Sequence, residues 1–238
     1  MSDTALRGEF LSTIDWWREA GIDTLVEEEA RDWLAAARPA PAPAASPAAA
    51  TAKAPASVPA TLDAIAAFYA EDAMFGRPDG RLLPQGDAAS GLMLLADQPE
   101  PGDDEAGQII GGEVGRLFDR MLAAIGRDRA SIYLTTMTPV RVPGGRPESA
   151  ALARWTEIAR AHVSIAAPRL LLLLGDAATR AFIGTSLADA RGRVHSLNLG
   201  GHNVRAMATF HPRFLLQQPA RKADAWRDLR LLLEELGQ

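Results

Sequence analysis

Two ionisable side chains in this sequence each follow an apolar run of strand length, and together they could cleave a bond. Asp97 follows residues 91–96 (GLMLLA), and His211 follows the run at 204–209. A carboxylate just past a buried strand can orient a water molecule or act as a general base, and an imidazole there can stabilise charge on a leaving group. The plain alternatives are a solvated acidic loop around Asp97 and a structural histidine at 211.

Arginines and an aromatic residue also follow apolar runs of strand length and indicate a nucleic-acid contact. Arg213 and Phe214 come directly after the His211 motif, and a cation beside an exposed aromatic suits a phosphate contact next to a base wedge. Phe214 could equally belong to the core. Arg141 and Arg146 add charge to the loop 136–147, which is otherwise a stiff surface turn.

The residue inventory excludes several chemistries and predicts that the protein carries no metal or other cofactor. The chain has 238 residues and no cysteine, which excludes disulfides, thiolate metal sites and cysteine nucleophiles. His162, His195 and His202 have no spacing typical of metal ligands. The glycines near residue 112 lack a following lysine and have acidic neighbours, so they match a phosphate-binding loop poorly.

The elements that must position these side chains alternate along the chain. We expect strands at 91–96, 131–136, 169–174 and 204–209, and helices at 61–70, 113–125, 148–166, 176–183 and 220–236. Strands separated by helices predict a three-layer α/β/α fold around a central four-stranded, mainly parallel sheet. Ligands of such sheets lie beyond the carboxyl ends of the strands, where Asp97 and His211 would meet.

The N-terminal quarter of the chain has a different character. Residues 1–37 show helical periodicity, residues 38–60 are rich in proline and alanine and are typical of a linker, and residues 61–238 form the α/β domain.

A net charge of −5 argues against a strongly cationic nucleic-acid binder but leaves room for a small basic patch. No secretory signal or membrane-length apolar run is present, so we expect a cytoplasmic protein that does not contact a membrane.

Three blocks of the sequence, in this order, resemble the family 4, iron–sulfur type uracil-DNA glycosylases: 119–147, 167–184 and 208–236. The resemblance covers most of residues 61–238 and implies a DNA partner, as damaged or abasic duplex or as single strand. That family removes uracil by cleaving the N-glycosidic bond of a nucleotide flipped out of the helix. Two cluster cysteines of the family fall on Val140 and Trp155, and the other pair is absent too, so the resemblance predicts a member without the cluster.

Carried over residue by residue, the resemblance gives Asp97 and His211 the catalytic positions. The pocket residues would be Gln98, Ile110 and Thr136, where Ile110 replaces a base-stacking phenylalanine and Thr136 a base-pairing asparagine. Isoleucine offers no π face, and a hydroxyl cannot make the paired donor and acceptor contacts of an amide.

Three functions follow from these observations. The first is an active, divergent glycosylase, in which Asp97 and His211 face each other across a cavity of base size. The second is a catalytically inactive relative that binds DNA, or a protein partner through residues 1–37, and uses this helical segment and the linker at 38–60 as a tether. The third, an unrelated small-molecule enzyme on the same fold, accounts less well for the block HPRFLL at 211–216.

Overall fold

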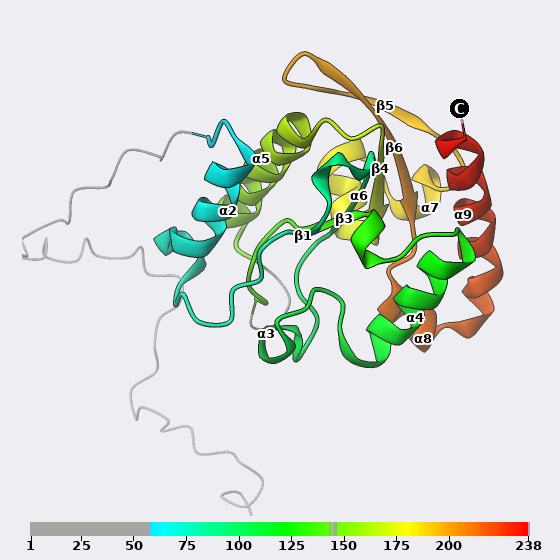
Figure 1. Cartoon of the computed structure of the whole chain (residues 1–238), viewed down its shortest axis with the longest axis horizontal. Helices are drawn as coiled ribbons and strands as arrows, with labels where there is room; N and C mark the ends of the chain where they lie inside the picture. The colour runs from blue at the N-terminus through cyan, green and yellow to red at the C-terminus, as the bar shows by residue number, and fades with distance from the viewer. Residues whose placement is uncertain (1–57, 143, 145–146, 238) are drawn as a thin grey trace, which may run out of the picture. The chain divides into compact units, whose positions relative to one another are not determined.

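The computed structural model describes residues 58–142, 144 and 147–237 (Figure 1). The predicted helical extension at 1–37, nearly all of the predicted linker at 38–60, and Arg146 therefore lie outside the described residues. Within the described ranges, no helix is both long enough and apolar enough to cross a membrane.

A mostly parallel sheet forms the centre of the described chain. Its strands are β1 (Gln85–Gly86), β2 (Leu92–Ala96), β3 (Tyr133–Thr136), β4 (Leu170–Leu174), β5 (His195–Leu199) and β6 (His202–Thr209). They are ordered β1-β3-β2-β4-β6-β5; the pairs among β3, β2, β4 and β6 are parallel, while β1 and β5 are antiparallel edges. The four predicted strands are confirmed and form the parallel centre, and the two edge strands are additional to the prediction.

The helices cover both faces of this sheet, as predicted. They are α2 (Leu62–Glu71), α3 (Asp103–Ala106), α4 (Gly112–Ala124), α5 (Ser149–Ala166), α6 (Asp176–Ile183), α7 (Leu187–Ala190), α8 (Pro212–Gln217) and α9 (Lys222–Leu236). Figure 1 shows α4, α8 and α9 on one side of the strands and α5 with α6 on the other. Each of these layers must bury an apolar stripe against the sheet, which gives a three-layer α/β/α architecture.

The core consists of two apolar layers separated by the sheet. Alternate residues of β2 point to opposite faces: Leu94 packs in the layer that contains α4 and α9, and Leu95 packs in the layer that contains α5, α6 and α7. The run of five leucines in β4 is buried along its whole length, as expected for a strand covered on both faces. This rigid centre fixes the loops that leave the carboxyl ends of β2, β4 and β6.

Candidate active site

A cavity of about 380 Å³ opens at the carboxyl ends of the parallel strands. Its walls come from the segments that follow β2, β4 and β6, from α7 and from α8: Asp97, Leu174, Gly175, Asp176, Ala177, Leu187, Phe210, His211, Arg213, Phe214 and Gln217. The volume falls within the roughly 300–1,000 Å³ typical of small-molecule sites. Asp97 and His211, which are 114 positions apart in sequence, thus line one cavity.

Asp97 is a half-buried carboxylate directly after β2. Burial raises its pKa above the ordinary value of 3.8, and a backbone hydrogen bond from Gln98 and the charges of Arg213 and Arg141 oppose that rise. A carboxylate in such surroundings binds a proton more readily than one in water. It therefore suits the acceptance of a proton from a water molecule.

His211 is the N-cap of α8 and is 5 % exposed. Its Nδ1 accepts a hydrogen bond of 3.2 Å from the backbone N–H of Arg213, so the ring proton is assigned to Nε2. Burial, together with the nearby Arg213 charge, lowers the pKa of His211 to about 3. Nε2 has no hydrogen-bond partner among the described residues. The side chain is thus a neutral imidazole with an N–H donor still to be satisfied.

Glu100 was not predicted as a site residue, yet it lies beside His211. Its carboxylate is 3 % exposed; Oε1 lies 3.2 Å from Nη1 of Arg213 and 3.6 Å from Nδ1 of His211. Burial raises the pKa of Glu100, and the charge of Arg213 opposes the rise. Glu100 lines a neighbouring cavity of about 520 Å³ rather than the cavity of Asp97. The available signal was a second acidic residue, three positions after Asp97, in the loop that follows β2.

Asp103 organises the loop that carries Asp97 and Glu100. Its carboxylate, 1 % exposed, accepts the backbone N–H groups of Glu100 at 2.8 Å, Ile110 at 2.7 Å and Gly111 at 2.6 Å. Arg129 donates to the carbonyls of Ile109 and Ile110 at 2.7 Å each. These bonds hold Ile110 at a φ of 55°, a conformation that β-branched residues rarely adopt.

The three predicted pocket residues lie beside this cavity rather than in its lining. The Gln98 side-chain carbonyl accepts the backbone N–H of Val142 at 3.0 Å, and Ile110 is fully buried. The Thr136 hydroxyl donates to the carbonyl of Thr138 at 2.7 Å. All three therefore support the loops around the cavity, and a direct contact with a base stays a prediction.

Only some of the predicted DNA-contacting residues line the cavity. Arg213 and Phe214 line the cavity, while Arg141 donates to the carbonyl of Pro99 at 3.2 Å and so braces the loop after β2. Arg146 lies outside the described residues. A contact of any of these side chains with DNA stays a prediction.

The arrangement of strands and motifs agrees with what comparison with known proteins shows. The family model of the Uracil DNA glycosylase superfamily matches residues 83–230, which is well over half of the chain. The chain belongs to the uracil DNA glycosylase superfamily. The match begins just before β1 and ends within α9, so it includes every strand described above and both Asp97 and His211.

Within the superfamily, the chain is similar to proteins named type-4 uracil-DNA glycosylase from three archaea. It is 25% identical to that of Pyrobaculum aerophilum over 152 residues, which are 61% of this chain and 78% of the relative. It is 22% identical to that of Archaeoglobus fulgidus over 160 residues, 64% and 80% of the two chains. The relative from Saccharolobus solfataricus is 22% identical over 161 residues, 64% and 74% of the two chains.

This superfamily member resembles family 4 but cannot hold its iron–sulfur cluster through thiolates, because it has no cysteine. The two matched cysteine positions, Val140 and Trp155, belong to an apolar cluster under α2 and α5. Trp155 is 7 % exposed and stacks on Phe75, with ring centroids 6.3 Å apart. Hydrocarbon and aromatic rings supply no donor set for iron. The residues present do not fit the group, and apolar packing holds the segments together there.

Proposed function

We propose that this protein is a DNA N-glycosylase that removes a base from a nucleotide extruded from DNA. The observation that carries the proposal is the single cavity lined by Asp97 and His211 at the carboxyl ends of the central strands. Membership of the superfamily and likeness to proteins named type-4 uracil-DNA glycosylase support it. A base within a duplex cannot reach such a cavity, so the target nucleotide must leave the stack or be single-stranded.

In this proposal His211 acts on the departing base. As the bond between C1′ and the base nitrogen breaks, the electron pair moves onto the base, and negative charge collects on its carbonyl oxygen. The neutral imidazole donates a hydrogen bond from Nε2–H to that oxygen. Because the ring is buried and its Nδ1 is already held by the backbone of Arg213, the bond strengthens as charge develops, which lowers the barrier.

Asp97 acts on the other side of the breaking bond. Its carboxylate stabilises positive charge on the sugar and orients a water molecule toward C1′. The oxygen of that water forms the new bond to C1′ and its proton passes to Asp97. The base leaves as its anion and takes up a proton from solvent, Asp97 returns its proton to solvent, and the products are the free base and an abasic sugar. Arg213 and Phe214, on the rim of the cavity, would contact the opened strand.

The decisive experiment measures abasic-site formation on uracil-, hypoxanthine- and xanthine-containing oligonucleotides, both single-stranded and duplex. We expect product with at least one base, and a loss of at least a hundredfold in rate for Asp97→Asn and His211→Gln. Asp104→Asn removes a negative charge at an exposed position of α3 and serves as the matched control. Folded wild-type protein that releases no base from any substrate would refute the proposal and favour an inactive, DNA-binding relative.

A further inference from the structure

The wall of the cavity that α8 and the residue before His211 form contains a column of stacked planar groups. Phe214 stacks on Phe210, with ring centroids 5.0 Å apart and an interplanar angle of 21°. The guanidinium of Arg191 lies over the Phe210 ring, 4.0 Å from its centroid. Arg191 is half-buried at one end of the column, whereas Phe214 at the other end is 37 % exposed and lines the cavity.

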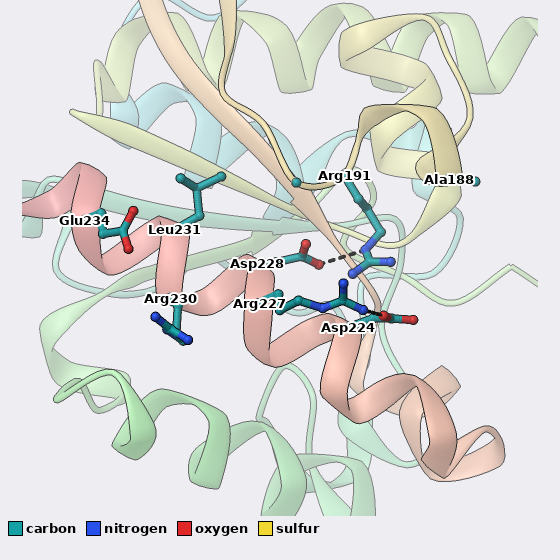
Figure 2. A pocket seen from close by; sticks show the side chains of 9 residues that line it. Ala188, Arg191, Asp224, Arg227, Asp228, Arg230, Leu231 and Glu234 are labelled. Carbon is teal, nitrogen blue, oxygen red and sulfur yellow. Dashed lines mark hydrogen bonds and ion pairs between the residues drawn. The ribbon is translucent and has the colours of Figure 1, made fainter.

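The column is held in place at the end that Arg191 forms. Nε of Arg191 donates to Asp228 of α9 at 2.8 Å, and the Thr209 hydroxyl donates to the same carboxylate at 2.7 Å. Asp228 is 1 % exposed, so this ion pair is well shielded from solvent. Figure 2 shows Arg191 reaching Asp228 across a second cavity of about 540 Å³. In that cavity Arg191 is paired with Asp228, and Arg227 is paired with Asp224.

The opposite end of the column is free to receive a ligand. Gln217, one helical turn after Phe214 on α8, also lines the cavity, and its amide makes no hydrogen bond within the described part of the chain. A side-chain amide has one hydrogen-bond acceptor and two donors, and it can therefore form hydrogen bonds with the edge of a base. An aromatic face and an unsatisfied amide thus lie side by side on the rim.

We propose that Phe214 stacks on the extruded base itself and that Gln217 contacts the edge of that base. The inference rests on the proposed glycosylase function and adds an aromatic face and a side-chain amide, which Ile110 and Thr136 lack. Stacking tolerates every base, because every base has a π face, and an exposed, rotatable amide reads an edge loosely. The chemical class of substrate is therefore a single unstacked nucleotide, with modest preference among damaged bases. Arg191 is a positioning residue that pre-orders the column.

Stacking on the base can be distinguished from insertion of Phe214 into the gap that the base leaves in a duplex. Insertion matters only for duplex DNA, whereas stacking matters equally for a single strand. We expect Phe214→Ala to lower kcat/KM about tenfold on single-stranded and duplex substrates alike, and Phe214→Tyr to restore it. Trp226→Ala, an exposed aromatic on α9 outside this cavity, should leave both unchanged. A loss confined to duplex substrates would overturn the proposal.

A binding measurement tests the same contact without turnover. Fluorescence of a single 2-aminopurine that is flanked by baseless spacers in a single-stranded oligonucleotide, so that no neighbouring base stacks on it, falls when that base stacks on an aromatic ring. We expect wild-type protein and Trp226→Ala to quench it, Phe214→Ala to lose most of the quenching, and Gln217→Ala to weaken binding severalfold. Equal quenching by wild type and Phe214→Ala, or none by wild type, overturns the inference even if the enzyme releases bases. Quenching without base release would instead refute only the catalytic proposal.

Discussion

Replacing Asp103 by asparagine should destabilise the protein and disorganise the loop that carries Asp97. The carboxylate accepts three backbone N–H groups between 2.6 and 2.8 Å and is almost fully buried. Asparagine keeps one oxygen, so the N–H of Gly111, which bonds to Oδ1, would face an NH₂ group or lose its partner. One buried, unsatisfied donor costs about 1–3 kcal/mol, and the remaining bonds lose their charge assistance. We therefore expect the free energy of unfolding to fall by about 2–4 kcal/mol.

The matched control for this substitution is Asp104→Asn. Asp104 is the next residue of α3 and is exposed, so the same charge change there should alter the free energy of unfolding by no more than about 0.5 kcal/mol. Urea denaturation followed by tryptophan fluorescence measures both variants. In the proposed glycosylase assay, Asp103→Asn should also reduce the rate at least tenfold at a temperature where it is folded, since small misplacements of catalytic groups are costly. Equal unfolding free energies for the two variants would refute the role assigned to Asp103.

Three further predictions concern the apolar cluster and the buried titratable groups. Trp155→Ala should lower the free energy of unfolding, measured by urea denaturation, by about 3–5 kcal/mol. Trp155→Phe should lower it by less than half of that amount, because the indole N–H has no partner among the described residues. Equal losses in the two variants would contradict this account of Trp155. Burial lowers the pKa of His162 to about 4, so the unfolded chain, with a value near 6.5, takes up the proton first as pH falls. Relative to His162→Gln, the wild type should therefore lose up to about 1.4 kcal/mol of stability per pH unit between pH 6.5 and 4, and a constant difference would argue against a buried neutral ring. In pH profiles of kcat/KM, activity should fall on the acid side above pH 3.8, as Asp97 takes up a proton. This acid limb should keep its position in His211→Gln, because His211 stays neutral down to about pH 3. A limb that moves in that variant would assign the titration to His211 instead.

The sequence was sufficient to predict the centre of the fold because its signals there are local. Apolar runs bounded by turn residues mark β2, β4 and β6, and a chain of alternating strands and helices leaves little choice of architecture. The edge strands carry weaker signals. β1 has only two residues, and β5 is half exposed, with a buried residue only at every second position near its end. The Gly200–Gly201 pair between β5 and β6 was the available indication of a hairpin.

The site was predictable where the parallel-sheet rule applies and not where it depends on contacts across the fold. The rule brings Asp97 and His211 to one cavity from two strand ends. It says nothing about Glu100, whose partner Arg213 is 113 positions away. Nor does it distinguish Asp103, which binds the loop backbone, from its exposed neighbour Asp104. Side chains of one chemical type take opposite roles here because only the folded loop decides which of them is buried.

The absence of cysteine and the burial of Ile110 and Thr136 have a common structural basis. Asp103 with the apolar cluster around Trp155 fixes the loops on the β2 and β3 side, so Ile110 and Thr136 are absorbed into the framework. On the α8 side of the cavity, Phe214 lines the wall and ends its column. In the proposed mechanism, chemistry depends on Asp97 and His211 while recognition depends on α8. Substitutions of Phe214 should then act mainly on KM and those of Asp97 mainly on kcat, a separation that a site built on a single loop would not show.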